Sequence, residues 1–260
     1  MTQIARLTDR AVLRIAGADA REFLQGQLTN DMAALKPGAP LWAGLLSAQG
    51  KYLFDMILHD TGDAALVDIS ADRSAALAQR LTMFKLRKAV TIEAAPDLAV
   101  FAGWDGPVDA PYDPRLPGLG RRWIAAAAEE TATSDDYDAH RLALGVPDTP
   151  DFEVDGTMWL ETNAVELNGV SFTKGCYVGQ ENTARMHHRD KLRKRLLPVL
   201  LTTVPGEDRI LRTGDREAGD LRTWRGTRGI ALLRIEYADA QLTLGGQRVT
   251  VDWPSWIGDR

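Results

Sequence analysis

The chain has 260 residues, 45% of them hydrophobic and 26% charged, and carries a formal net charge of −5. This near-average composition excludes a disordered chain, a collagen and a coiled coil, and the length allows one large domain or two to three small ones. The mild acidity argues against non-specific binding of nucleic acid or an anionic membrane, although a local basic patch stays open.

The N-terminal part of the chain predicts the order strand, helix, strand, strand twice. Asp19 followed by Glu22 resembles a capping box that begins the first helix. Gln49-Gly50 is typical of the turn of a hairpin between two apolar runs. Periodicity places strands at 11–15, 41–46, 52–58, 65–69, 89–93 and 98–101, and a second helix over 72–86.

The rest of the chain contains two further kinds of segment, a connector followed by a strand and a helix, and then a region of short apolar runs. A connector rich in proline and glycine over 105–120 leads to a strand over 122–127 and a helix over 134–144, which Gly145 and Pro147 end. From Arg195 onward, short apolar runs separated by glycines predict a small β-barrel or sandwich. We therefore expect an α+β region over residues 1–194 and a C-terminal β-barrel domain over 195–260.

Neither a secretory signal nor a membrane span is expected. The first 14 residues are mixed in polarity and lack an apolar core, and no window approaches 18 consecutive apolar residues. These observations predict a cytoplasmic protein without a membrane partner.

The single cysteine lies in the most unusual segment of the sequence. One cysteine cannot form an internal disulfide, so it is either buried or chemically used. Gly175 and Gly179 allow close backbone approach, and a helix beginning near Gly179, together with the Lys174 ammonium, would lower the pKa of the Cys176 thiol or bind an anion. From this segment alone, a buried filler and a functional thiol are equally supported.

Lys174 to Glu181 matches the Lys-Gly-Cys-Tyr-x-Gly-Gln-Glu signature of the YgfZ family. That family comprises folate-binding proteins of iron–sulfur cluster maintenance, includes mitochondrial assembly factors and is related to the glycine-cleavage T protein. Residues 17–20, 23–31, 145–147, 160–163 and 183–185 resemble further blocks of the family, so the likeness covers nearly the whole chain. The resemblance implies an α+β fold of duplicated β-α-β-β folate-binding modules around a central hole, plus a C-terminal β-barrel, in agreement with the predicted elements.

The resemblance also implies a cofactor, tetrahydrofolate or a one-carbon derivative, and roles for particular residues. Glu161 would accept hydrogen bonds from the pterin, as the corresponding residue does in T proteins, and Tyr137 would pack on it. Cys176 is expected to be the functional thiol, with Lys174 tuning it. The other candidate folate-binding residues are Tyr177, Arg185, Asn30 and Arg141, and the backbone of the motif is completed by Gly175, Gly179, Gln180 and Glu181.

A basic run interrupts the acidic chain just before the expected barrel. One interpretation is that the run binds an anion: the glutamate tail of folate, or a partner nucleic acid or protein. A solvated edge of the barrel is equally supported. The members of the run are Arg185, His187, His188, Arg189, Lys191, Arg193, Lys194 and Arg195, with Asp190 between them.

Some chemistry is disfavoured by the residues themselves. His59, His140, His187 and His188 stand in no recognisable catalytic context, which argues against a cysteine nucleophile with a histidine base. A stable metal or cluster site needs about four ligands, so we expect no stably bound metal and only a transient or shared cluster contact through Cys176. T proteins carry a Lys-Asp pair where this chain has Ala75-Ala76, so aminomethyl transfer is doubtful.

Three functions stay open from the sequence. The first is a tetrahydrofolate-binding accessory protein that assembles or repairs iron–sulfur clusters in client enzymes through Lys174-Gly175-Cys176-Tyr177. The second is a folate-dependent one-carbon transferase, and the third is a module that docks tRNA or protein without catalysis. The partners implied are a reduced folate and iron–sulfur client or assembly proteins.

Overall fold

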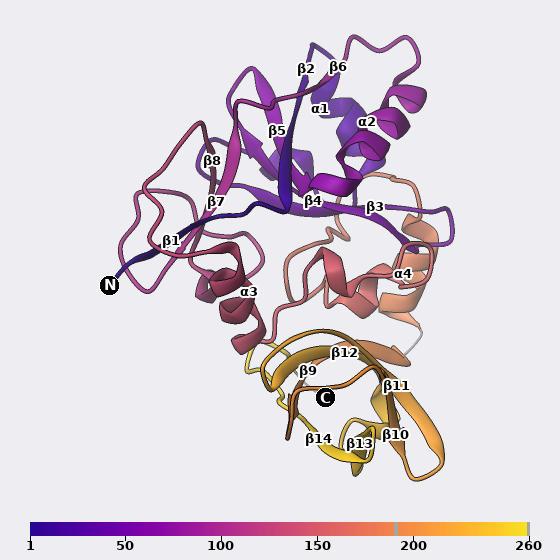
Figure 1. Cartoon of the computed structure of the whole chain (residues 1–260). Helices are drawn as coiled ribbons and strands as arrows, with labels where there is room; N and C mark the ends of the chain where they lie inside the picture. Colours follow the sequence, from indigo (N-terminus) through magenta and orange to yellow (C-terminus); the bar gives the residue numbers. More distant parts are fainter. Residues whose placement is uncertain (190–191, 259–260) are drawn as a thin grey trace.

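The computed structural model describes residues 1–189 and 192–258, and Figure 1 shows an α+β body at one end and a barrel at the other. The body contains an antiparallel five-stranded sheet in the order β3-β4-β5-β2-β6. Its strands are β2 (Arg10–Ala16), β3 (Leu41–Leu46), β4 (Tyr52–Asp60), β5 (Ala64–Ser70) and β6 (Thr91–Ala94).

The helices α1 (Ala20–Gln27) and α2 (Ala71–Lys85) share one apolar core with this sheet. Leu77 and Leu81 of α2 are fully buried, as their spacing of one helical turn predicts. Asp19 precedes α1 as expected, but its side chain accepts from the backbone N–H of Ala89 at 2.7 Å instead of capping the helix.

The repeated order of strand, helix, strand and strand is confirmed, and the two units interleave. The first unit is β2-α1-β3-β4 and the second is β5-α2-β6-β7, and β2 lies between β5 and β6 in the sheet. Strand β7 (Ala99–Trp104) is not part of this sheet. It pairs with β1 (Gln3–Arg6) and β8 (Arg121–Ala125) in a three-stranded sheet. Helix α3 (Ser134–Ala143) begins at a Thr133–Asp136 capping box and contacts β1 and the barrel.

The C-terminal part is a closed barrel with its own apolar core. Helix α4 (Gln180–His188) precedes it, and the first barrel strand begins at Lys194. The barrel order is β10-β11-β12-β9-β14-β13. Its strands are β9 (Lys194–Leu201), β10 (Ile210–Thr213), β11 (Arg216–Arg225), β12 (Arg228–Arg234), β13 (Leu242–Leu244) and β14 (Gln247–Val251).

The predicted fold class, α+β with a C-terminal β-barrel, is therefore confirmed. Among the described residues, no helix is long and apolar enough to cross a membrane.

Candidate functional site

The segment that carries the cysteine is clamped to the body by its lysine. Lys174 is buried, and its Nζ donates to the backbone oxygens of Gln25 at 2.7 Å, Leu28 at 2.6 Å and Asn30 at 2.9 Å. These oxygens lie at and just beyond the C-terminal end of α1, where free carbonyls and the helix dipole favour a cation. Burial lowers the pKa of Lys174 to about 8, and the charge of Asp31 opposes that shift. The ammonium group is therefore held by the N-terminal block of the chain.

Cys176 itself is exposed, as is Gly175 before it. The next residue, Tyr177, is buried, and its ring centroid lies 5.1 Å from Nζ of Lys174. Burial raises the pKa of Tyr177 to about 12. The thiol thus stands at the surface on a short segment whose two flanks are anchored in the interior.

Two glycines of the motif have different structural roles. Gly179 precedes α4 with a φ of +86°, and a Cβ there would lie 2.5 Å from the backbone oxygen of Ser47. Asn182 of α4 donates to the backbone oxygen of Gln49 at 2.5 Å, so the helix begins against the β3–β4 turn. A Cβ on Gly175 would meet nothing within 4 Å. Packing therefore explains Gly179 and does not explain Gly175.

The basic run divides between interior and surface. Arg195 is buried, pairs with Glu166 and donates from Nε to Oδ1 of Asn163 at 2.5 Å. The ring of His187 stacks on Phe172 with 3.9 Å between centroids. Gln180 and Glu181 begin α4, and Asp190 and Lys191 lie outside the described residues. The exposed members of the run are Arg185, His187, His188, Arg189, Arg193 and Lys194.

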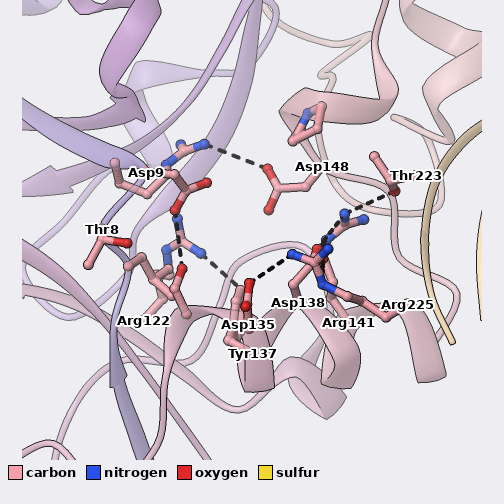
Figure 2. A pocket seen from close by; sticks show the side chains of 14 residues that line it. Thr8, Asp9, Arg122, Asp135, Tyr137, Asp138, Arg141, Asp148, Thr223 and Arg225 are labelled. Carbon is pink, nitrogen blue, oxygen red and sulfur yellow. Dashed lines mark hydrogen bonds and ion pairs between the residues drawn. The ribbon is translucent and has the colours of Figure 1, made fainter.

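A polar cavity of about 290 Å³ lies where the body meets the barrel (Figure 2). Arg225 of β11 reaches α3 across its rim, 2.8 Å from Asp135 and 3.1 Å from Asp138. The charged residues of the wall are the carboxylates Asp9, Asp135, Asp138 and Asp148 and the arginines Arg10, Arg122, Arg141 and Arg225.

Arg10, Arg122 and Arg141 of the wall belong to a buried ionic network, whereas Arg225 is half-exposed. Asp68 of β5 is 2.6 Å from Arg10 of β2 and 2.7 Å from Arg122 of β8, so one carboxylate joins three strands from both sheets. Nη1 of Arg122 also donates to the hydroxyl of Tyr137 on α3 at 3.3 Å. Buried charges are tolerated when they are paired and hydrogen-bonded in this way.

The network continues to the barrel. Arg115 lies 3.0 Å from Asp148, and Arg141 lies 2.7 Å from Asp151 and donates to Oγ1 of Thr223 on β11 at 3.2 Å. Burial works to raise the pKa of Asp148, but Arg115 and Arg10 outweigh it and hold that pKa well below its usual range. The carboxylate therefore stays ionised beside the cavity.

A second cavity, of about 480 Å³, shares Asp9 and Pro150 with the first. Its wall includes the aromatic side chains of Tyr52 and Phe152 and the guanidinium of Arg73. Tyr52 donates to Asp55 at 3.1 Å, and burial raises the pKa of that carboxyl, which Thr149 also contacts at 2.9 Å.

The predicted folate-binding residues do not form one group. Tyr137 and Arg141 line the polar cavity. Asn30 and Tyr177 lie with the lysine at the end of α1, and Arg185 lies on α4.

Glu161 lies apart from both of these groups, in the 3-10 helix η4 (Trp159–Thr162). Its Oε2 accepts from the backbone N–H of Met158 at 2.9 Å. Burial raises the pKa of Glu161, while Lys194 and Arg222 of the barrel lower it. Glu161 is thus half-buried at the junction with the barrel.

Comparison with known proteins identifies the family. Residues 193–259 match the CAF17 C-terminal beta-barrel domain. The chain is 33% identical to the mitochondrial iron–sulfur cluster assembly factor IBA57 of Mus musculus, and 34% identical to that of Homo sapiens, each over 89% of this chain and 77% of the relative. The chain belongs to the IBA57 family. It also shares its fold with the glycine cleavage aminomethyltransferase T of Bartonella henselae, with a TM-score of 0.73 and 13% identity over 100% of this chain and 87% of that one.

The IBA57 relatives correct one prediction. Both are named as mitochondrial proteins, which contradicts the prediction of a cytoplasmic protein. That prediction used only the lack of a secretory core and of a membrane span. Neither property distinguishes the cytoplasm from another aqueous compartment.

Sequence reasoning missed most of the ionic network in this IBA57-family chain. Asp68 lies 58 positions from Arg10 and 54 from Arg122, and Arg115 lies 33 positions from Asp148. Local patterns cannot reveal pairs at such separations. Tyr137 and Arg141 are the two members of the network that are named from the sequence, and there they are assigned to folate binding.

Proposed function

We propose that the protein is an accessory factor for the assembly or repair of iron–sulfur clusters in client proteins, with Cys176 as its functional thiol. The observation that carries this proposal is the exposure of Cys176 between two anchored neighbours. Inert cysteines are among the most buried residues, whereas reactive ones are accessible. The names of the IBA57 relatives support the same role.

The structure suggests how the motif would act. Lys174 and Tyr177 fix the segment, and Gly175, which packing does not require, leaves open space beside the thiol. A partner carrying a cluster would approach Cys176 there, and the contact would be shared because a cluster needs about four ligands.

Cys176→Ser and Cys176→Ala test this role in cells that lack the native protein. We expect both variants to leave iron–sulfur enzyme activities at the level of the cells without the protein. Thr173→Ser, an exposed neighbour in the same segment, is the matched control and should restore wild-type activity. Full activity from both cysteine variants would overturn the assignment.

We also propose that a reduced folate occupies the two adjoining cavities. When bound, it would carry one-carbon groups. The residues present fit its chemistry. Asp9 and Asp135 offer carboxylates to the amino edge of a pterin, Tyr52 and Phe152 offer aromatic walls, and Arg73 offers a cation to the glutamate tail. The cavities measure about 290 and 480 Å³, so the first is near the lower end of the size range of ligand-binding pockets and the second lies within it.

Titration with tetrahydrofolate tests this second part. Trp104 lies 5.7 Å from the ring of Tyr137, so we expect saturable quenching of tryptophan fluorescence. Asp9→Asn should weaken binding at least tenfold, whereas Asp215→Asn, in a turn of the barrel, should not. Absence of saturable quenching would remove the folate proposal and leave the proposal for the thiol standing.

The geometry gives less support to a one-carbon transferase in which the thiol meets the folate. Cys176 is not among the residues that line either cavity. Steady turnover of a methyl or formyl donor by the purified protein would restore that alternative.

A further inference from the structure

The end of helix α2 displays three large apolar side chains to solvent. Met83 is 63% exposed, Phe84 45% and Leu86 85%. Figure 1 places this end of α2, and the turn that leads to β6, at the edge of the molecule away from the barrel. Clusters of exposed apolar side chains on a folded protein mark interaction sites.

The backbone at this point is strained as well as exposed. Leu86 has a φ of +50°, a region that favours glycine and that leucine rarely adopts. Leu86 gains little packing in return, because most of its surface faces solvent. The turn is held by a bond from Nζ of Lys85 to the backbone oxygen of Val90 at 2.6 Å and by an ion pair of Lys88 with Glu22 at 2.7 Å. Strain of this kind persists where the surrounding structure enforces it, and it gathers at functional sites.

Charge sets the same segment apart from the rest of the chain. Residues 73–92 contain five cations, Arg73, Arg80, Lys85, Arg87 and Lys88, and no Asp or Glu, although the chain as a whole carries −5. The rest of the chain therefore carries a formal −10. Arg80 lies over the ring of Phe84 at 5.3 Å, and Arg87 is exposed. We name Arg80, Met83, Phe84, Leu86 and Arg87 the α2 tip.

We propose that the α2 tip is a docking site for a protein partner that offers an apolar groove with an acidic rim. This proposal rests on the proposed function, since the partner would be an iron–sulfur carrier or client. Met, Phe and Arg are the residue types enriched at protein interfaces. The charge of the tip complements carboxylates around such a groove.

A protein partner fits the observations better than an anionic membrane. Both lysines of the turn are engaged within the chain. The remainder of the chain, with its formal charge of −10, would be repelled by an extended anionic surface, whereas a groove touches the tip alone. The tip has five residues, whereas a stable interface has roughly 20–30 residues on each side, so the contact is transient or one part of a larger one.

Site-specific crosslinking identifies the partner. The photoreactive residue p-benzoylphenylalanine is placed at position 84 or, as a matched control, at position 204, where Val204 is 67% exposed. We expect position 84 alone to form an adduct with an iron–sulfur or assembly protein, at an apolar peptide flanked by Asp or Glu. Adducts with lipid, adducts with a second copy of this chain, or no adduct above the level of position 204 would each overturn the proposal.

Titration of the purified pair separates this proposal from the proposed function. Phe84→Ser and Arg87→Glu should weaken the complex at least tenfold without changing the melting temperature, whereas Val204→Ser and Arg212→Glu should not. Cys176→Ser should keep the affinity of the complex while losing cluster-dependent activity. Wild-type affinity in both tip variants would refute the docking site and leave the role of the thiol intact.

Discussion

At the scale of single residues, His59 shows how burial sets a protonation state. It lies on β4, and its Nε2 is buried without a hydrogen-bond partner among the described residues. Burial lowers the pKa of His59 to about 4, and the neighbouring charges of Asp68 and Arg122 oppose each other. The imidazole is therefore neutral in the folded protein at pH values where it would be charged in the unfolded chain.

This difference makes stability depend on pH. Between pH 6.5 and about 4 the unfolded chain binds a proton at His59 and the folded protein does not, so folding becomes less favourable as the pH falls. His59→Gln should remove this dependence. Urea unfolding at pH 7 and pH 4.5 should show the wild type losing about 2 kcal/mol more than the variant. Equal losses would contradict the assignment.

The sequence predicts the chemical effect of Lys174 on the thiol but does not predict which groups the lysine contacts. A cation two positions before Cys176 predicts a tuned thiol, but the side chain reaches three carbonyls of the N-terminal block. The sequence does not show that the end of α1 lies beside this segment. Exposure of Cys176, in contrast, agrees with the interpretation of a functional thiol.

At the scale of elements, the start of α4 lies against the β3–β4 turn through a close approach at Gly179 and a bond from Asn182. Gly179 combines a positive φ with close approach to Ser47 of the β3–β4 turn, whereas Gly175 has neither constraint. We therefore expect substitutions at the two glycines of this motif to have different effects on stability.

Gly179→Ala should destabilise the protein by about 2–4 kcal/mol, because both the backbone conformation and the contact become strained. Gly175→Ala should leave the melting temperature unchanged. Thermal unfolding of the two variants checks the pair. Similar melting temperatures for both would show that α4 does not need this contact. Loss of activity in a stable Gly175→Ala protein would indicate that a partner approaches there.

Most elements could be predicted, because their signals are local. The spacing of Leu77 and Leu81 gives α2, and Gln49-Gly50 gives the hairpin of β3 and β4. The place of β7 in a second sheet and the strand order of the barrel depend on pairings between distant segments. Local patterns carry no information on such pairings, and the cavity between body and barrel depends on them.

At the scale of the whole molecule, the buried ionic network joins the body to the barrel. Arg10, Arg122 and Asp68 link the two sheets, and Arg141 links α3 to Thr223. Each arginine is nearly inaccessible, so removing one leaves buried carboxylates with fewer cationic partners.

Arg115→Met should therefore destabilise the protein by about 3–5 kcal/mol, because Asp113 and Asp148 lose their shared cation. Arg14→Met, which breaks the exposed ion pair with Asp63, should cost less than about 1 kcal/mol. Chemical unfolding of the two variants in the same buffer measures the difference. A cost for Arg115→Met as small as that for Arg14→Met would show that the network contributes little to stability.

The exposed thiol has a last consequence for handling the molecule. Because the chain holds one cysteine, oxidation can form a disulfide only between two molecules, and that bond joins them motif to motif. Such a dimer hides both thiols from any partner while leaving each fold intact. Preparations without a reductant will therefore contain a growing inactive fraction at twice the chain mass on a non-reducing gel, and dithiothreitol will restore it.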